Sequence, residues 1–411
     1  MKGKEKMKSV NKSYKYRIYP NKEQQDILEF NIGSARFVFN HVKTTYELYR
    51  KIGKEYGYTI YANRKLFNVI LRDLKKYYPF LKEANSTVLQ KAYDNLISAY
   101  KMVGKANHGW VKFKSRKNPV QSFRTLNIEI IDGKLKLPKI KSLIPMKYSR
   151  PIRGDILTAT ISRNNSNQYF VSINVKNSPV KSLKNTNQNV GIDLGLKDMA
   201  TLSNGFKSGR IQLKEVDNKI KRQNQILSRR FKDGCNWIKA KTKLNRLYQK
   251  KKDIVIDFLH KTTTKIVREF DKIYVGNVNS QLGLKNKYLA RTTTDQHWYE
   301  FKRQLEYKSD WYDKHFMVVD EKYTSKTCSN CGYVTESLKL NIRQWICPEC
   351  KMHHDRDVNA ACNILTVGTT GLAFSKNQHV SWWIRNPLTS LGHGSSTTLI
   401  YQILRNPFNE Y

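Results

Sequence analysis

The chain has 411 residues, more than one hydrophobic core usually organises, so we expect about two to four compact units. It contains 75 Lys and Arg against 33 Asp and Glu, a formal net charge of +42 at pH 7. This surplus predicts a polyanionic partner, and nucleic acid is favoured over an anionic membrane because no run of about 18 apolar residues occurs. The start MKGKEKMKSVNKS has no apolar signal-peptide core, so we expect a soluble, intracellular protein.

The first half of the chain changes from strand to helix patterns and back. SYKYRIYP alternates like a strand and stops at Pro20, and apolar residues at helical spacing continue to about residue 105. Short strands return after about residue 110, with an Asp-Gly turn at Asp132 and a hairpin around residues 164–167. This order predicts an antiparallel β unit into which a helical region is inserted.

The stretch HGWVKFKSRKNPVQSFR lies between the predicted helices and strands. It interleaves Trp110, Phe113 and Phe123 with Lys and Arg. Nucleic-acid bases stack on aromatic rings, and the phosphate backbone attracts cations. The pattern favours a nucleic-acid contact strip, although a solvated basic loop has a similar composition.

The second half of the chain follows a strand and helix order. Residues 179–188 are polar and without pattern, which indicates a linker, and NVGIDLG then begins an apolar strand. Basic helices follow, and two further strands start near residues 271 and 315. Because crossover connections join parallel strands, the strands that start near 189, 271 and 315 should lie parallel in one α/β sheet.

Four of the six cysteines form two Cys-x-x-Cys pairs, Cys328 with Cys331 and Cys347 with Cys350. Each pair can present two thiolates to one ion, and four thiolates leave no open coordination position. The spacing predicts a structural, tetrahedral zinc site of the ribbon type in a reducing compartment. The other two cysteines stand alone and are expected to be small packing residues.

Two acidic motifs suit metal chemistry. Asp193 ends the strand in GIDLG, where ligands bind in open α/β sheets, although an Asp that caps a turn is the common alternative. Asp357 in HDRDVNAACNIL precedes a helical run, where it could instead be the helix N-cap. Carboxylates suit Mg²⁺, and three can hold two ions about 4 Å apart for phosphodiester hydrolysis. His353 and His354 are expected to belong to local packing or the ribbon surface.

The chain resembles the TnpB family of transposon-encoded, RNA-guided DNA endonucleases, which are related to type V CRISPR effectors. The resemblance rests on YKYRIYPNKEQ, SARFVFNH, FKSRKNPVQSF, GIDLG, the cysteine pairs and HDRDVNAACNIL, in this order, and covers about residues 14–365. It implies a RuvC-like nuclease domain of RNase H fold, split by the zinc element, in which three acidic residues bind Mg²⁺. Asp193 matches the first of the three and Asp357 the third.

The second acidic residue is missing from its usual place. In most of the family the strand that corresponds to DKIYVGNVNS ends in Glu, and by register this position is Gly276. A parallel neighbour lies about 4.8 Å away, so Glu321, at the end of the strand HFMVVDE, is predicted to supply the carboxylate from the side. Asp320 alternates to the opposite face and is the weaker choice, unless a bulge exchanges the two.

The resemblance also implies the partners and the location. A guide RNA transcribed from the transposon end would pair with double-stranded target DNA next to a short transposon-adjacent motif, in the prokaryotic cytoplasm at the nucleoid. The helical insert and the β unit would hold both nucleic acids. Candidate contacts are Lys76, Lys112, Lys114, Arg116, Lys117 and Arg124.

The predicted fold is α+β and multidomain, with an antiparallel β-barrel-like unit that carries a helical bundle, followed by an α/β RNase H-like (RuvC) domain that carries a zinc ribbon. The predicted boundaries are residues 1–20 and 110–178 for the wedge-like β unit, 21–109 for the helical recognition insert, 179–188 for the linker, 189–326 and 353–366 for the nuclease, 327–352 for the ribbon and 367–411 for a C-terminal tail.

Two other functions remain open. A nuclease-deficient, RNA-guided repressor would share every feature except metal-dependent hydrolysis, and Gly276 favours it. A guide-independent structural nucleic-acid protein would explain the charge and the zinc site, but not the GIDLG and DRDVNAA pair. DNA cleavage distinguishes the first from the endonuclease, and copurification of RNA distinguishes the second.

Overall fold

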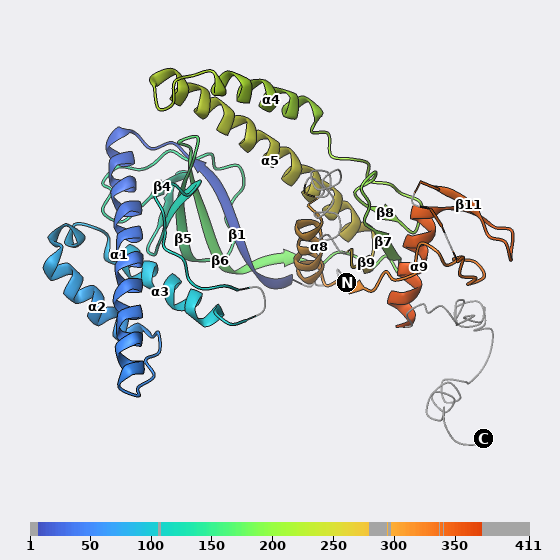
Figure 1. Cartoon of the computed structure of the whole chain (residues 1–411), viewed down its shortest axis with the longest axis horizontal. Helices are drawn as coiled ribbons and strands as arrows, with labels where there is room; N and C mark the ends of the chain where they lie inside the picture. The colour runs from blue at the N-terminus through green and yellow to red at the C-terminus, as the bar shows by residue number, and fades with distance from the viewer. Residues whose placement is uncertain are drawn as a thin grey trace, which may run out of the picture. The chain divides into compact units, whose positions relative to one another are not determined.

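The computed structural model describes residues 7–105, 108–278, 294, 297–336, 338–339 and 341–371. The chain is a mixed α/β protein with two compact units, residues 1–181 with 216–250 and residues 182–215 with 251–411 (Figure 1). Residues 372–411, which make up most of the predicted C-terminal tail, lie outside the described residues.

An antiparallel sheet in the order β1-β6-β5-β2 forms the centre of the first unit (Figure 1). Its strands are β1 (Met7–Ile18), β2 (Val120–Thr125), β5 (Asp155–Asn164) and β6 (Tyr169–Lys181). The predicted antiparallel unit is therefore confirmed. It is an open sheet and not a barrel: within the described chain β1 and β2 are its edges, and β3 and β4 form a separate two-stranded sheet.

The two predicted hairpin turns are present. β3 (Glu129–Ile131) and β4 (Lys134–Lys136) are joined by Asp132 and Gly133, whose φ angles are 49° and 70°. A two-residue turn with positive φ at both positions matches the twist of the flanking strands, and Asp-Gly adopts it readily. In the β5–β6 turn, Asn167 has a φ of 55°. The Asp and Asn residues that marked the turns in the sequence thus supply the left-handed conformations.

Helices fill the segment between β1 and β2, as predicted. They are α1 (Lys22–Glu55), α2 (Arg64–Tyr77), a 3₁₀ turn (Pro79–Lys82) and α3 (Ser86–Met102). Asn21 caps α1: its side chain accepts from the Gln24 N–H at 2.8 Å, and the Gln24 side chain accepts from the Asn21 N–H at 3.0 Å. This capping box satisfies two donors at the helix start. The core shared by helices and sheet includes Leu28, Val38, Phe67, Leu89, Ile161 and Val171.

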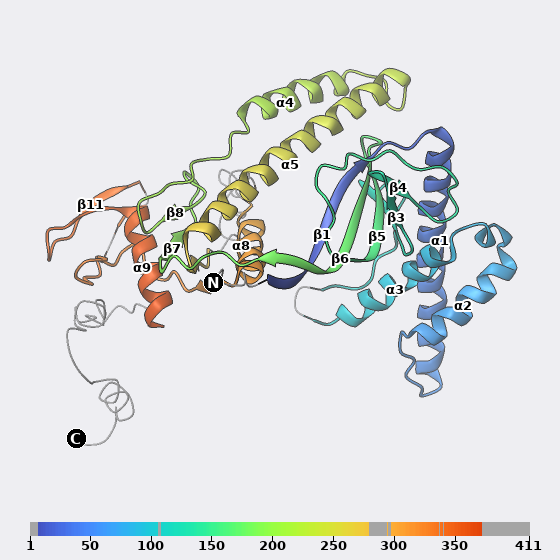
Figure 2. The same cartoon turned by 180° about the vertical axis from the view of Figure 1, so that it is seen from behind.

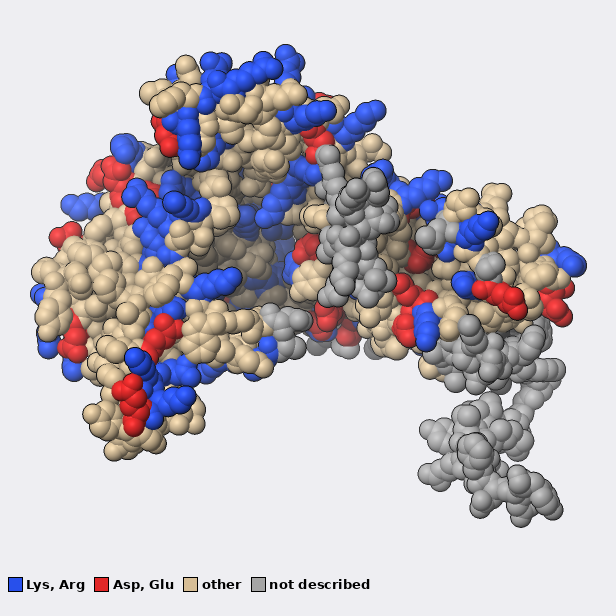
Figure 3. All heavy atoms as spheres, in the orientation of Figure 1, with Lys and Arg blue, Asp and Glu red and all other residues tan. Residues whose placement is uncertain are grey.

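Two basic helices lie in the chain between the two stretches of the second unit, and residues 216–250 of this pair belong to the first unit. α4 (Lys214–Ser228) and α5 (Cys235–Glu269) form a hairpin, in which the Gln223 side chain donates to the Ala240 carbonyl at 3.2 Å. Figure 3 shows Lys and Arg side chains gathered over this hairpin. Such a surface suits a polyanion better than a neutral partner.

A sheet in the order β10-β9-β7-β8 forms the centre of the second unit. β7 (Asn189–Asp193), β9 (Lys272–Gly276) and β10 (His315–Val319) are parallel, and β8 (Thr201–Leu202) is antiparallel to β7. The predicted parallel arrangement is therefore confirmed. Because the three strands run in one direction, their carboxyl ends meet at one edge of the sheet, where ligands bind in α/β folds.

The remaining elements surround this sheet. α8 (Trp298–Tyr312) precedes β10, and α9 (Arg356–Thr370) packs on β7 in both views (Figures 1 and 2). Between β10 and α9, the short strands β11 (Gln344–Ile346) and β12 (His353–Asp355) pair antiparallel. Of the helices in the described ranges, none combines the length and apolar character that a membrane span requires.

Candidate functional site

Asp193 is the last residue of β7, and a glycine two residues before it lets α9 approach the strand. A Cβ on Gly191 would lie 2.1 Å from the Ala361 carbonyl oxygen and 2.5 Å from the Leu365 backbone nitrogen. Both distances are far below van der Waals contact, so no larger residue fits without moving α9. The first glycine of GIDLG therefore brings the helix that carries Asp357 against the strand that carries Asp193.

Asp357 lies in the first turn of α9, and the N-cap is Asp355. Asp355 Oδ1 accepts from the N–H groups of Asp357 and Val358, both at 3.1 Å, and its Oδ2 accepts from Lys207 Nζ at 2.7 Å. The alternative in which Asp357 caps the helix is therefore wrong. The Asp357 carboxylate accepts from Arg343 Nη1 at 3.1 Å instead.

Gly276 ends β9, and Glu321 follows the end of β10 by two residues. The strands pair with Val319 opposite Gly276. A Cβ on Gly276 would lie 2.9 Å from Glu321 Oε2 and 3.5 Å from Glu321 Cβ. The Glu321 carboxylate therefore lies in the space where a side chain on residue 276 would begin. Asp320 is exposed, and its Oδ1 accepts from the Lys322 N–H at 3.1 Å.

The charges of Asp357 and Glu321 act on the carboxyl group of Asp193. Burial, together with the negative charges of Asp357 and Glu321, raises the pKa of Asp193 to about 7, while Arg356 and Arg343 act in the opposite direction. Burial also raises the pKa of Glu321. The oxygen atoms of these three carboxylates do not all lie within 4.8 Å of one another. In the described ranges, only the cysteine cluster brings three or more possible metal-ligand atoms that close together. The group is a set of hard oxygen donors whose repulsion a divalent cation would relieve.

Two buried asparagines of α9, which the sequence motifs did not single out, hold the segment after Glu321. Asn359 Nδ2 donates to the Thr327 carbonyl at 2.7 Å, and Asn363 Nδ2 donates to the carbonyls of Thr324 and Thr327 at 2.8 and 2.6 Å. The Thr324 N–H donates in turn to the Glu321 carbonyl at 3.1 Å. Their i, i+4 spacing in NAACN places both on one helix face and was the available sequence signal.

The four predicted cysteine ligands come together. Their sulfur atoms all lie within 4.8 Å of one another, and the Cys328–Cys350 and Cys331–Cys347 pairs are each 3.6 Å apart. A disulfide would need about 2.05 Å, whereas a tetrahedron with metal–sulfur bonds of about 2.3 Å has edges of about 3.8 Å. The thiols therefore fit one tetrahedral metal ion.

His354 contributes more to this cluster than its place in the sequence suggested. Its ring does pack, with a centroid 4.8 Å from that of Trp345. Its Nε2, however, lies 3.0 Å from Cys328 Sγ, and the residue is only 8% exposed. A proton on this ring nitrogen would stabilise the negative charge of the Cys328 thiolate when a metal is bound. Its pairing opposite Trp345 in the β11–β12 ladder decides this contact, and the sequence spacing does not reveal that pairing.

The six candidate nucleic-acid contacts all lie in the first unit. The exposed ones are Lys76, Lys112, Arg116 and Lys117, and the partly buried ones are Lys114 and Arg124. The Lys114 ammonium lies 4.3 Å from the centre of the Phe39 ring, and burial lowers its pKa. Lys114 therefore has a packing role as well as a charge.

The aromatic part of the basic strip is smaller than expected. Trp110 and Phe113 are 52% and 57% exposed. Phe123 is buried in the core, because it lies on the inward face of β2 opposite Ile161 of β5. The strip therefore presents two rings to solvent, and Phe123 is a correction to the prediction.

Three family models match parts of the chain. They are described as "Helix-turn-helix domain" at residues 7–54, "Probable transposase" at residues 172–285 and "Cas12f1-like, TNB domain" at residues 298–364. In this structure, residues 7–54 form β1 and nearly all of α1.

Relatives match most of the chain. A protein of Streptomyces pristinaespiralis named "Putative RNA-guided DNA endonuclease" is 32% identical over 375 residues, which are 89% of this chain and 92% of that protein. The "TnpB-like protein L770" of Acanthamoeba polyphaga mimivirus is 29% identical over 387 residues, 87% of this chain and 73% of that protein. The chain belongs to the TnpB family.

Further relatives of this TnpB protein include "Putative RNA-guided DNA endonuclease InsQ" of Escherichia coli K12, which is 27% identical over 380 residues, 88% of this chain and 93% of that protein. Among solved structures, the Cas12f1 protein of a Cas12f1–sgRNA–target DNA complex aligns with 87% of this chain and 99% of its own, at 15% identity and a TM-score of 0.35. This structural likeness is too low to assign roles to residues.

Proposed function

We propose that this TnpB protein binds a guide RNA derived from the transposon end and cleaves matching double-stranded DNA next to a short transposon-adjacent motif. Two relatives that match most of the chain carry the name of an RNA-guided DNA endonuclease. The net charge of +42 supports a complex with RNA and DNA. The exposed residues Lys112, Arg116 and Lys117 would contact a phosphate backbone, and the protein would act on nucleoid DNA in the cytoplasm.

The proposed nuclease is a RuvC-like domain of RNase H fold, residues 189–326 and 353–366, and its site is the edge where β7, β9 and β10 end. Asp193, Glu321 and Asp357 would hold catalytic Mg²⁺. The observation that carries this proposal is the Glu321 carboxylate at Gly276, 2.9 Å from the point where a Cβ would stand. In this proposal, Glu321 would supply from beyond β10 the acidic group that β9 lacks.

When bound, two Mg²⁺ ions would activate a water molecule and stabilise the leaving oxygen of the phosphodiester. The chain itself positions the carboxylates and controls their protons. Asp193, with a pKa raised to about 7, must release its proton before it can bind a cation. Arg343 holds the Asp357 carboxylate at 3.1 Å and, like Arg356, favours the charged form of Asp193.

The cysteine cluster is proposed to hold one structural zinc ion in a ribbon of residues 327–352. Four thiols in tetrahedral proximity support this assignment. The ribbon joins the turn that carries Glu321 to β12 and α9, so the ion would fix this connection. It would take no part in hydrolysis, because four protein ligands fill its coordination sphere.

The test is cleavage of a linear duplex that carries the matched target and flanking motif, by protein coexpressed with RNA from its transposon end. Cleavage should require Mg²⁺, stop with EDTA and fall at least about 100-fold in Glu321→Ala, since even outer-shell partners of a metal cost about 10- to 100-fold. Asp320→Ala is the matched control. It removes an exposed carboxylate one residue away and should retain activity.

The outcomes separate the candidate functions. Tight, guide-dependent DNA binding without cleavage in the unmodified protein would mean a nuclease-deficient repressor, the function that Gly276 favours. Gently purified protein without discrete RNA would contradict a guided function altogether and favour a structural nucleic-acid protein. An equal loss of DNA cleavage in Asp320→Ala and Glu321→Ala would contradict the proposed role of Glu321 as a metal ligand.

A further inference from the structure

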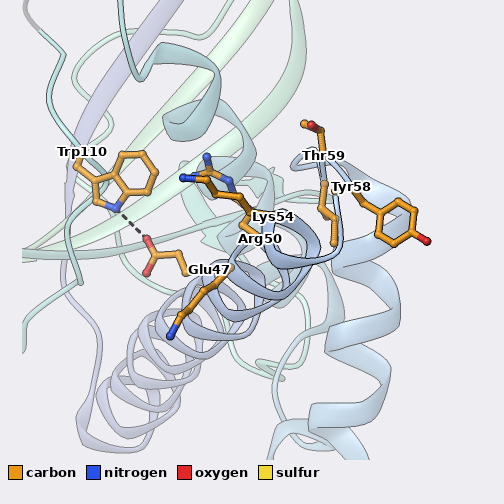
Figure 4. Close-up of a pocket in the computed structure, with 9 residues that line it drawn as sticks. Glu47, Arg50, Lys54, Tyr58, Thr59 and Trp110 are labelled. Atoms are coloured by element: carbon orange, nitrogen blue, oxygen red, sulfur yellow. Dashed lines mark hydrogen bonds between the residues drawn. The ribbon is translucent and has the colours of Figure 1, made fainter.

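The first unit contains a pocket of about 580 Å³ at the carboxyl end of α1. Its walls are the last turns of the helix, the loop that follows it and Trp110 (Figure 4). Arg50, Lys51 and Lys54 line it together with a single carboxylate, Glu47. The pocket therefore combines an aromatic ring with a surplus of positive charge.

The Trp110 ring is held in place although the residue is 52% exposed. Its Nε1–H donates to Glu47 Oε1 at 2.9 Å, the bond drawn in Figure 4. The ring packs edge-on against Tyr100, with centroids 6.0 Å apart. An exposed aromatic ring that is already fixed loses little conformational freedom when a ligand covers it.

Glu47 has a supporting role and does not repel an anionic ligand strongly. Its Oε2 forms an ion pair with Lys43 at 2.5 Å, and its Oε1 also accepts from the Tyr100 hydroxyl at 2.9 Å. Despite its burial, these bonds and that of Trp110 lower the pKa of Glu47. The carboxylate is thus neutralised locally and fixes the ring.

Arg50 is positioned for stacking. Its guanidinium lies over the Trp110 ring, 5.1 Å from the centroid. Within the described residues, Arg50, Lys51 and Lys54 form no ion pair with a carboxylate. The planar guanidinium and the indole can stack on a flat base, while ammonium groups attract a phosphate.

The opposite wall is a loop that folds back on the helix. The Tyr58 N–H donates to the Gly53 carbonyl at 2.6 Å, and the Tyr46 hydroxyl donates to the Ile60 carbonyl at 3.2 Å. A Cβ on Gly53 would lie 3.0 Å from both Tyr58 O and Ile60 Cδ1, so glycine permits the close return. The pocket is therefore formed by anchored elements on both sides.

We propose that this pocket binds one unpaired nucleotide of a bound nucleic-acid strand, with its base stacked on Trp110 and Arg50 and its phosphate near Lys51 and Lys54. The inference rests on the proposed function, because it assumes that the protein holds RNA and DNA. An acidic peptide would use the cations but leave the fixed ring unexplained. The strand can be the guide RNA or the DNA, which offer the same chemistry.

Photo-crosslinking of the intact protein–RNA complex tests the proposal and distinguishes the two strands. One sample carries 4-thiouridine in the guide and another carries 4-thiothymidine in the target duplex, and adducts are located by mass spectrometry of peptides. An adduct on the peptide of Trp110 or Tyr58 in one sample identifies the strand. Adducts elsewhere, with none on these peptides in either sample, would overturn the proposal.

Variants give an independent measurement. Trp110→Ala and Arg50→Gln should each weaken binding of the identified strand about 10-fold, because base stacking on a side chain contributes about a factor of this size. Trp110→Phe keeps an aromatic ring, so its affinity for the identified strand should fall less than about 3-fold. Arg50→Gln changes an exposed position, so it remains informative if Trp110→Ala fails to fold.

The control is Tyr299→Ala, an aromatic that is 79% exposed in the second unit and should bind like the unmodified protein. Unchanged binding in both Trp110→Ala and Arg50→Gln, in a complex that still holds RNA and cleaves DNA, would overturn the pocket proposal alone. Absence of RNA and DNA binding in the unmodified protein would overturn the proposed function and this inference with it.

Discussion

Glu321 Oε2 lies 2.9 Å from the point where a Cβ on Gly276 would stand, although the two residues are on different strands. The parallel pairing of β9 with β10 places Val319 opposite Gly276, and the chain then turns so that Glu321 points back over the glycine. The Glu321 carboxylate on one strand therefore occupies the space that a side chain on residue 276 of the neighbouring strand would need.

Moving the carboxylate back to β9 tests this relationship. Gly276→Glu combined with Glu321→Ala should recover at least about a tenth of the unmodified cleavage rate, because it restores a carboxylate for the metal and removes the nearest obstacle, so that only the end of the Ile364 side chain has to shift. Gly276→Glu alone should be inactive, since its side chain would meet Glu321 Oε2 and, at 3.0 Å, Ile364 Cδ1.

The comparison is the cleavage rate of both proteins against Glu321→Ala alone, with Gly276→Ala/Glu321→Ala as the variant that restores volume without charge. A double variant that folds but stays as inactive as Glu321→Ala would show that position 276 cannot replace position 321.

Gly191→Ala should destabilise the second unit by more than about 3 kcal/mol, because its methyl group would collide with the α9 backbone at 2.1 Å. Gly33→Ala is the matched control. Gly33 lies within α1, has no neighbour within 4 Å of the new methyl and should gain about 0.5–1 kcal/mol. Urea unfolding measures both, and equal midpoints for the two variants would contradict the close packing of α9 on β7.

Removal of the proposed zinc should unfold the ribbon and release the Glu321 turn. Purified protein is expected to contain about one zinc ion per chain, and the Cys350→Ser variant should contain less than about 0.2 zinc ions per chain. Cys235→Ser is the control, since Cys235 is exposed and outside the cluster, and it should keep its zinc. Metal analysis of the three proteins decides the point, and full zinc content in Cys350→Ser would exclude the cluster as the binding site.

Lys308 should make stability depend on pH. It is 5% exposed, and among the described residues its ammonium donates to neutral groups only, the His260 carbonyl and the hydroxyls of Thr263 and Thr264. Burial lowers its pKa to about 8. An unfolded Lys titrates near about 10.4. Between these values the unfolded chain binds a proton that the folded chain has lost, so folding becomes more favourable as the pH rises from about 8 to about 10.4, and the penalty is complete below about 8.

The measurement is chemical unfolding of the unmodified protein and Lys308→Met across this range. Relative to the variant, the unmodified protein should gain about 2.5 kcal/mol between pH 8 and pH 10.4. Parallel curves for the two proteins would show that Lys308 is not destabilised by its surroundings.

Local sequence signals were sufficient to predict features that are formed by residues of a single segment. The Cys-x-x-Cys spacing predicted a cluster that gathers its sulfur atoms, and Asp-Gly predicted a turn that has positive φ at both residues. The order of strands and helices predicted the parallel alignment of β7, β9 and β10, because crossover connections restrict the topology. These features depend on residues that are close in sequence or on chain connectivity.

Tertiary structure decided what depends on the facing of side chains and on partners distant in sequence. Phe123 is buried because it lies on the inward face of β2. The cap of α9 is Asp355, and not Asp357, which the sequence had suggested. The sequence alone determined that Asp193, Glu321 and Asp357 follow strands or begin a helix. Only the register of β10 on β9 and the approach of α9 to Gly191 bring Asp357 and Glu321 near enough to raise the pKa of Asp193, because side-chain direction follows strand pairing and not position in the chain.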